Sequence, residues 1–209
     1  MKLLVLLGLM FFVLTFCGLS DRLKSLQSST NSGSTSGSNS SKTTSSTVEK
    51  PQLTAAQQAI EDSATEITWD QQGISWKLPS GWKKMDVKKE TFNYSGPDNA
   101  YFGVNISPMS DDFPVDSSLT AYYDQAIQQI RNGKYESARY LEIDGIKGVE
   151  FTEAPPEEKD GIRRHQWIAY RSYLGQKQML NVMLSATGKN FEKHTDDFPA
   201  IMYSMKSSK

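Results

Sequence analysis

The chain has 209 residues, of which 23 are lysine or arginine and 24 are aspartate or glutamate, so its formal net charge is −1. A nucleic-acid-binding domain is expected to carry an excess of basic residues, and we therefore expect no nucleic-acid partner. The single cysteine excludes an intrachain disulfide. The C-terminal part, of roughly 140 residues, is long enough to form one domain without a covalent cross-link.

The first residues have the pattern of an export signal. Lys2 gives a positive start, and an uncharged, largely apolar run follows from Leu3 to Phe16. A signal-peptide core takes about 7–15 apolar residues, whereas a membrane-spanning helix takes about 20. We therefore predict a signal peptide over residues 1–17 and export from the cytoplasm.

The single cysteine, Cys17, lies at the end of this run in the sequence LTFC. Bacterial lipid-attachment signals have a leucine, two small or neutral residues and then the cysteine. Phe16 departs from that pattern, so the lipid-attachment motif is degenerate. We predict lipid attachment at Cys17 and a membrane-anchored protein of the cell envelope that faces away from the cytoplasm. The alternatives are secretion after cleavage behind Ser20, an uncleaved anchor over residues 3–19, and a cysteine without a role.

A polar segment separates the export signal from the folded part. Residues 28–50, SSTNSGSTSGSNSSKTTSSTVEK, are almost all serine, threonine, asparagine and glycine. Such a segment buries too little apolar surface to offset its ordering entropy. We predict a disordered tether over residues 18–50, a lead-in helix or linker over 51–65, and the folded domain over 66–209.

The folded domain begins with strands. In AYFGVNIS, residues 100–107, Phe102, Val104 and Ile106 alternate with small or polar residues, which is the period of a half-buried strand. Gly73 and the turn sequence SGPDN mark connections between such segments. We predict strands over residues 67–70, 74–79, 87–94 and 100–107.

A helix, two hairpins and a last helix follow. Apolar residues recur at three- and four-residue steps from Leu119 to Ile130, behind candidate N-cap residues at 116–118. Asp144-Gly145 is a strong hairpin signal. We predict strands over residues 136–143, 146–154, 162–174 and 176–186, and a final helix from Asp196 to about Lys206. Together the elements predict the α+β class, with an antiparallel sheet of six to eight strands packed with helices.

The domain shows no sequence signature of catalysis or metal binding. His165 and His194 are the only histidines, and neither belongs to a metal-ligand spacing such as HExxH. No GxSxG turn or phosphate-binding glycine loop occurs. We interpret His194, Asp196 and Asp197 as the polar start of the last helix. We predict no catalytic residue, no cofactor and no metal.

The strand IRRHQWIAYRSYL, residues 162–174, is unusual because one of its faces is both basic and aromatic. Such a face could bind an anionic sugar, a lipid head group or a peptide. Alternatively, the aromatic residues are good strand formers and the arginines cover a solvated sheet face. The candidate ligand face consists of Arg163, His165, Trp167, Arg171 and Tyr173.

Several segments in this order resemble the Mog1/PsbP/DcrB-like α/β sandwich family: GISWKLPSGWKK, YFGVNIS, SLTAYYDQAIQQI, IDGIKGVEFTEA and GQKQMLNVMLSATGKNFEKHTDDFPAIMYSMK. The resemblance covers roughly residues 67–206 and is strongest to small bacterial envelope lipoproteins. It implies a sandwich fold and a role as an assembly factor, a partner of other proteins or an exported lipoprotein. Enzymatic activity is not a hallmark of the family, and the resemblance transfers no functional residues.

Two functional hypotheses follow. The first is a non-enzymatic binding or assembly module, anchored to the membrane through its N-terminus and able to bind an envelope protein. The second is an envelope hydrolase with an unrecognised site in the sandwich domain. A deep pocket with convergent polar groups would favour the hydrolase. The sequence does not name the ligand, the partner or the oligomeric state.

Overall fold

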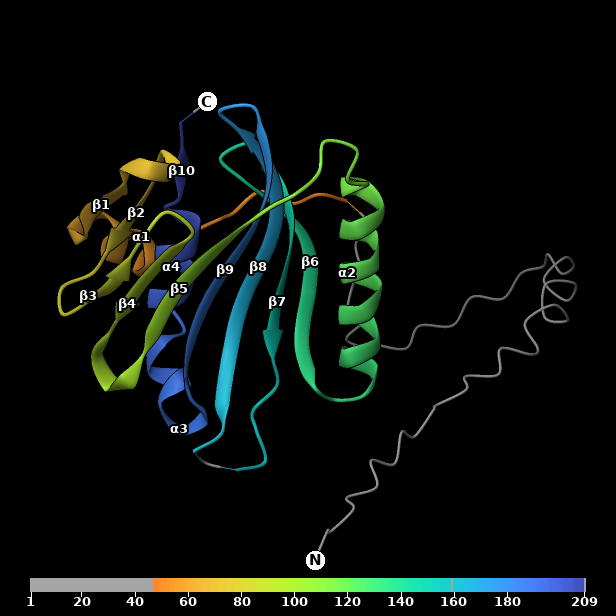
Figure 1. Ribbon diagram of the computed structural model, residues 1–209. Helices are drawn as coiled ribbons and strands as arrows, with labels where there is room; N and C mark the ends of the chain where they lie inside the picture. Colours follow the sequence, from red (N-terminus) through yellow and green to blue (C-terminus); the bar gives the residue numbers. More distant parts are fainter. Residues whose placement is uncertain (1–46, 159, 209) are drawn as a thin grey trace, which may run out of the picture. The chain divides into compact units, whose positions relative to one another are not determined.

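The structure is a computed structural model that describes residues 47–158 and 160–208. The predicted signal peptide, Cys17 and residues 18–46 lie outside the described residues. In the described residues, ten strands form two antiparallel sheets, a seven-stranded sheet with the order β3-β4-β5-β9-β8-β7-β6 and a three-stranded sheet with the order β1-β2-β10 (Figure 1). The strands are β1 (Thr65–Trp69), β2 (Ile74–Leu78), β3 (Lys83–Val87), β4 (Thr91–Ser95), β5 (Tyr101–Pro108), β6 (Tyr135–Ile143), β7 (Ile146–Glu153), β8 (Ile162–Tyr173), β9 (Gln176–Thr187) and β10 (Lys206–Ser207).

Within the part of the chain that the structure describes, four α-helices and three short 3₁₀ turns connect or cover the strands. The predicted α+β class and the antiparallel sheet packed with helices are therefore confirmed. The helices are α1 (Ala55–Ser63), α2 (Val115–Arg131), α3 (Gly188–Phe191) and α4 (Asp197–Tyr203), and the 3₁₀ turns are η1 (Asp70–Gln72), η2 (Pro97–Asn99) and η3 (Glu192–His194).

Two tight hairpins set the register of the large sheet. Asp144 and Gly145 have φ angles of 48° and 81°, and Leu174 and Gly175 have φ angles of 49° and 80°. Two successive residues at positive φ form the hairpin turn whose twist matches that of the flanking strands. The predicted hairpins at 144–145 and 175 are confirmed, and the first places Arg139 opposite Glu150 on the neighbouring strand.

Helix α2 covers one face of β6, β7 and β8 (Figure 1). Its predicted apolar stripe is confirmed, since Leu119 and Ala126 are buried and Tyr123 stacks on Tyr140 with ring centroids 4.5 Å apart. The predicted N-cap at 116–118 is wrong, because the helix begins at Val115 behind Pro114. Pro114 occupies the N-cap position, and no side chain of the described residues caps the helix.

The opposite face of the large sheet packs against the small sheet, α3 and α4. Between the two sheets lie Trp69, Trp76, Phe92 and Phe102, which are at most 1% exposed. The Trp76 and Phe92 rings are 5.0 Å apart, and Trp76 meets Phe102 edge-on at 5.4 Å. Burying an aromatic side chain of this size contributes about 2–3 kcal/mol, so this cluster is a major source of stability.

Two sequence-based boundaries are wrong. Residues 87–94 are not one strand, because β3 ends at Val87 and β4 begins at Thr91. The lysine-rich β3 has no alternating pattern, since it is an edge strand and few of its side chains are buried. The last helix ends at Tyr203 rather than near residue 206, and residues 206–207 instead pair with β2 as β10.

The N-terminal part of the described chain is attached to the domain at two places. Helix α1 begins with a capping box, in which Thr54 and Gln57 satisfy each other's backbone N–H groups, and it contacts α4. Before it, Glu49 forms a parallel bridge to β6: its N–H donates to the carbonyl of Tyr140 at 3.0 Å, and its carbonyl accepts from the N–H of Glu142 at 2.8 Å. Glu49 therefore lies at the free edge of the large sheet.

Strand β8 has one face toward α2 and one toward the small-sheet side, as strand alternation requires. Ile168 and Tyr170 pack beneath α2, whereas Trp167 lies in the core on the other side. A Cβ atom on Gly148 would lie 2.5 Å from the indole nitrogen of Trp167. Gly148 is therefore required for β7 to approach this tryptophan.

Candidate functional site

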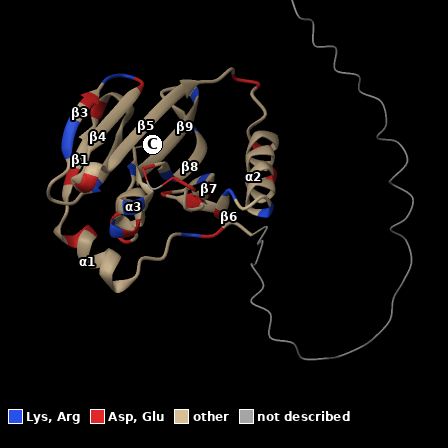
Figure 2. Cartoon of the chain, turned by 90° about the horizontal axis from the view of Figure 1, so that it is seen from below, with Lys and Arg blue, Asp and Glu red and all other residues tan. Residues whose placement is uncertain are grey.

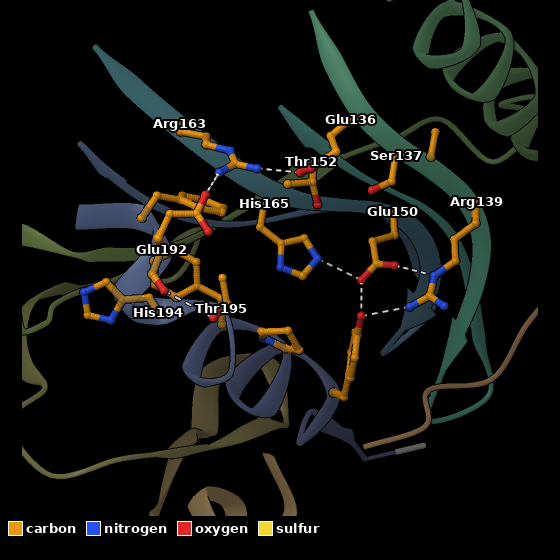
Figure 3. Close-up of a pocket in the computed structure, with 15 residues that line it drawn as sticks. Glu136, Ser137, Arg139, Glu150, Thr152, Arg163, His165, Glu192, His194 and Thr195 are labelled. Atoms are coloured by element: carbon orange, nitrogen blue, oxygen red, sulfur yellow. Dashed lines mark hydrogen bonds and ion pairs between the residues drawn. The ribbon is translucent and has the colours of Figure 1, made fainter. Parts of the chain in front are cut away.

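A cleft of about 490 Å³ opens at one end of β6, β7 and β8, on the side of the sheet away from α2. Its floor comes from these strands and its other wall from the segment that runs through α3, η3 and α4 (Figure 3). This volume lies in the usual range for ligand sites. The polar side chains at the cleft belong to Glu136, Ser137, Arg139, Glu150, Thr152, Arg163, His165, Glu192, His194, Thr195 and Tyr203.

Glu150 is the centre of the floor. It is 5% exposed, and its carboxylate accepts three hydrogen bonds: from His165 Nε2 at 2.8 Å, from Tyr203 Oη at 2.5 Å and from Arg139 Nε at 2.5 Å (Figure 3). Arg139 also donates from Nη1 to Glu49 and from Nη2 to Tyr203 Oη, each at 2.9 Å. Three strands, one helix and the N-terminal segment thus meet in one hydrogen-bonded network.

The network sets the charge state of its members. Burial by itself would raise the pKa of Glu150, but the hydrogen bond and charge of His165, with Arg139 and Tyr203, outweigh burial and lower that pKa to about 2. Burial raises the pKa of the Tyr203 phenol, and the neighbouring Glu150 carboxylate raises it further. Near neutral pH, Glu150 is therefore an ionised acceptor and Tyr203 a protonated donor. A carboxylate with this pKa is too weak a base for general base catalysis at neutral pH.

Arg163 lies at the mouth of the cleft and is 4% exposed. Its Nε donates to the carbonyl of Glu153 at 2.8 Å, its Nη2 donates to Glu136 at 2.5 Å, and its Nη1 donates to Glu192. The guanidinium also lies over the ring of Phe191, 4.2 Å from its centroid. Arg163 thus contacts residues of β6, β7, α3 and η3, and two carboxylates balance its charge.

His165 presents one ring nitrogen to the cleft. Nε2 is bonded to Glu150, whereas Nδ1 has no hydrogen-bond partner among the described residues and is not sealed from solvent. His194 differs: its Nδ1 is 3.1 Å from Asp197, and its Nε2 is fully buried and has no hydrogen-bond partner in residues 47–158 and 160–208. His194 also stacks on Phe198 with centroids 5.1 Å apart. His165 is therefore the histidine with a ring nitrogen available to a ligand.

The predicted ligand face is divided between three environments. Arg163 and His165 line the cleft, and Trp167 is fully buried in the core, where it donates to the carbonyl of Leu141. Arg171 lies eight residues from Arg163, roughly 25 Å along the strand. It is 8% exposed and hydrogen-bonded to Gln72, Gln178 and Ser207, and Tyr173 lies under its guanidinium at 4.6 Å. The structure thus brings two of the five residues to one site.

The residues that complete the cleft were not assigned from the sequence. They are Arg139, Glu150 and Tyr203 on the floor, with Glu136 and Glu192 at the mouth. One signal was present: the Asp144-Gly145 turn implies that Arg139 and Glu150 face each other across β6 and β7.

The carboxylates change the electrostatic character expected of the basic face. Figure 2 shows acidic and basic segments side by side around α3, whereas β3 carries a long basic stretch. Within residues 47–158 and 160–208, no group of three or more histidine, cysteine, aspartate or glutamate residues is placed to hold a metal ion. No helix in the same part of the chain is long and apolar enough to cross a membrane.

No family model matches this chain, and no curated protein matches it. Solved structures do resemble it. LpqN of Mycobacterium tuberculosis, described as involved in cell envelope biogenesis, aligns with a TM-score of 0.49 and 12% identity, over 68% of this chain and 84% of that one. The PsbP of Synechocystis aligns with a TM-score of 0.45 and 15% identity, over 70% and 93% of the two chains.

The Ran-binding protein Mog1p of Saccharomyces cerevisiae aligns with a TM-score of 0.41 and 9% identity, over 68% of this chain and 94% of that one. A structure from Bacteroides thetaiotaomicron is matched over 46% of its own length. Two of the three names in the predicted resemblance, PsbP and Mog1, thus occur among these structures, as the sequence led us to expect. The α+β fold itself rests on the strand and helix arrangement described above.

Proposed function

We propose that this protein is a non-catalytic binding module of the bacterial cell envelope, held at a membrane through its N-terminus, and that it binds a protein partner in the cleft beside β6, β7 and β8. The observation that carries the proposal is the cleft floor. Its charged side chains are fixed by hydrogen bonds from several elements, so the site keeps its geometry without a ligand.

Such preorganisation favours binding. Each long side chain that is immobilised on association costs about 0.5–1.5 kcal/mol. In this cleft, Arg139, Arg163 and Tyr203 are already held by their neighbours. Folding has therefore already ordered these side chains, and binding a ligand does not add the entropy cost of ordering them.

The test is site-specific photo-crosslinking in the full chain. A photoreactive phenylalanine derivative replaces Ser137, which is exposed at the cleft. The matched control carries it at Gln128, exposed on α2 at the other face of the sheet. We expect a discrete crosslinked protein in the membrane fraction from position 137 and none from position 128. Equal products at both positions, or none at position 137, would contradict a partner site in the cleft.

Membrane anchoring rests on the sequence pattern at residues 1–17 and is tested separately. We expect the intact mass of the mature protein to show loss of residues 1–16 and addition of a diacylglycerol at Cys17. Retention of residues 1–16 would contradict lipid attachment, and a chain that begins after Ser20 would indicate secretion.

One observation favours a hydrolase as the second candidate. The His165 ring is held by Glu150 at 2.8 Å, as a general base is held by its orienting carboxylate. Thr152 lies opposite His165 in the strand register, and Ser137 lies opposite Thr152. Among the described residues, however, no hydroxyl is hydrogen-bonded to His165.

Labelling of the full chain with a fluorophosphonate probe tests this second candidate. A hydrolase would be labelled at Thr152 or Ser137, and the His165→Gln variant would lose the label. The binding module leaves the wild-type chain unlabelled.

A further inference from the structure

The guanidinium nitrogens at the cleft already have acceptors within the protein. Each of the three guanidinium nitrogens of Arg139 donates to Glu150, Glu49 or Tyr203. Each of the three guanidinium nitrogens of Arg163 likewise has an acceptor. Three of the five N–H groups of each arginine are therefore engaged within the protein, and each guanidinium charge faces carboxylates that are already in place.

Hydrogen-bond acceptors at the cleft, in contrast, remain available to a ligand. The side chains of Glu136 and Glu192 are 58% and 66% exposed, although each gives one oxygen to Arg163. Both line the cleft, one from β6 and one from η3. A carboxylate has about four lone-pair positions, so each can accept further hydrogen bonds from a ligand.

The histidine at the cleft floor points to the same chemistry independently. His165 is 6% exposed, and its Nε2–H donates to Glu150. Nε2 faces Glu150, so Nδ1 is the ring nitrogen left for a ligand, and with the proton on Nε2 it is an acceptor. This nitrogen has no partner among the described residues and opens to the cleft. A ligand that donates hydrogen bonds would satisfy it.

The charge balance agrees with the hydrogen-bond count. Four carboxylates, those of Glu49, Glu136, Glu150 and Glu192, stand against the two guanidinium groups of Arg139 and Arg163. These six groups alone sum to 2 − 4 = −2. The cleft therefore attracts cations and repels the anionic sugars or lipid head groups that the basic strand face had led us to consider.

We propose that the cleft binds a basic side chain, a lysine ammonium or an arginine guanidinium, of the protein partner, with Glu136 and Glu192 as its charged acceptors and His165 Nδ1 as an acceptor on the floor. This inference rests on the proposed function and specifies the chemistry of the partner. The acceptors come from β6, β8 and the turn after α3, so their spacing depends on the folded sandwich.

The test measures binding of four fluorescein-labelled pentapeptides to the full chain by fluorescence anisotropy. They carry lysine, arginine, norleucine or glutamate as the central residue between glycines. We expect the lysine or arginine peptide to bind at least about tenfold more tightly than the norleucine peptide. The glutamate peptide should bind most weakly.

Two sets of variants locate the site. The double variant Glu136→Gln, Glu192→Gln should lose the preference for the basic peptide by about tenfold. The matched control, Glu90→Gln with Asp124→Asn, changes two exposed carboxylates elsewhere and should keep it. Because the double variant leaves the Arg163 charge without its partners, Ser137→Lys serves as a second test. It adds a cation at an exposed cleft position and should abolish binding of the basic peptides while the fold is kept.

Equal or tighter binding of the glutamate or norleucine peptide would overturn the inference, as would an equal loss in the control variant. Loss of the fold in the double variant, together with unchanged binding in Ser137→Lys, would also overturn it. If the crosslink from position 137 is obtained while no basic peptide is preferred, the proposed partner site stands and the inferred chemistry falls. If neither is obtained, both fall.

Discussion

Arg163 and Arg171 lie on the same face of β8, and both are more than nine-tenths buried, yet their surroundings differ. Arg163 is paired with two exposed carboxylates and stacks on Phe191. Arg171 has no carboxylate partner among the described residues. It donates to the carbonyl and amide oxygens of Gln72, to Gln178 and to a serine hydroxyl.

The difference distinguishes the candidate binding site around Arg163 from a structural contact at Arg171, which we call the clamp. Burial lowers the pKa of Arg171 to about 10, an effect that the nearby Tyr173 partly opposes. Its acceptors Gln72 and Gln178 are themselves buried, at 2% and 6% exposure. Arg171 therefore joins the two sheets through neutral groups, whereas the cleft end of β8 depends on ionised carboxylates that reach solvent. Four predictions test this division.

The largest effect is expected from Glu150→Gln at the cleft end. The substitution leaves Arg139 without its buried carboxylate, and breaking such a pair costs about 3–5 kcal/mol. Urea unfolding at pH 7 measures the loss. The control is Glu142→Gln on β6, which breaks an ion pair with the exposed Lys50 and should cost less than about 0.5 kcal/mol. Similar values for the two variants would show that the cleft floor is not held by charge.

Acid should weaken the cleft end in the same way. The pKa of Glu150 is about 2 in the folded protein and 4.5 ordinarily. The folded-state pKa is the lower of the two. The contribution of ionised Glu150 to the free energy of unfolding is therefore complete above pH 4.5 and is lost as the pH falls through about 2. The shift corresponds to about 3 kcal/mol. The free energy of unfolding between pH 5 and pH 2 should therefore fall more steeply in the wild type than in Glu150→Gln. Parallel curves would contradict the assignment.

A direct comparison replaces each arginine by methionine. Arg171→Met leaves buried neutral acceptors unsatisfied and should cost about 2 kcal/mol. Arg163→Met leaves Glu136 and Glu192, which are exposed and can be hydrated, so we expect about 1 kcal/mol. Urea unfolding of both variants gives the order. A larger cost for Arg163→Met would reverse the division between clamp and site.

The smallest effect is expected at the hairpin beyond Arg171. Leu174 is 88% exposed and has a φ of 49°, a conformation in which a leucine is strained and an asparagine is tolerated. Leu174→Asn should therefore stabilise the protein by about 0.5–1 kcal/mol. Leu174→Ala keeps a Cβ atom and should give no such gain. If both variants unfold at the same denaturant concentration, backbone strain at residue 174 does not lower the stability of the wild-type protein.

Much of the fold could be predicted because its signals are local. The two-residue turns at 144–145 and 174–175 predict their hairpins, and the apolar stripe from Leu119 to Ile130 repeats over about three turns of α2. Strand β3 was missed because an edge strand with exposed lysines lacks the alternating pattern of a half-buried strand. Strand β10 was missed because two residues are too few to carry any period.

The candidate site could be predicted only in part, because its contacts are long-range. The turn at 144–145 places Arg139 opposite Glu150, so that pair was accessible from the sequence. The pairing of Glu150 with His165 depends on the register of β7 and β8. A longer loop joins these two strands, and its sequence does not set their register. Tyr203 reaches the network through the packing of α4, which no local pattern specifies.

The bridge between Glu49 and β6 has a mechanical consequence. A pull on the chain from its N-terminal side loads this bridge, whose two main-chain hydrogen bonds and ion pair with Arg139 must yield before Glu49 can leave β6. Arg139 is also bonded to Glu150 and Tyr203. Part of the load therefore passes through the floor of the cleft, and a partner that stiffens this floor would raise the force at which Glu49 detaches from β6.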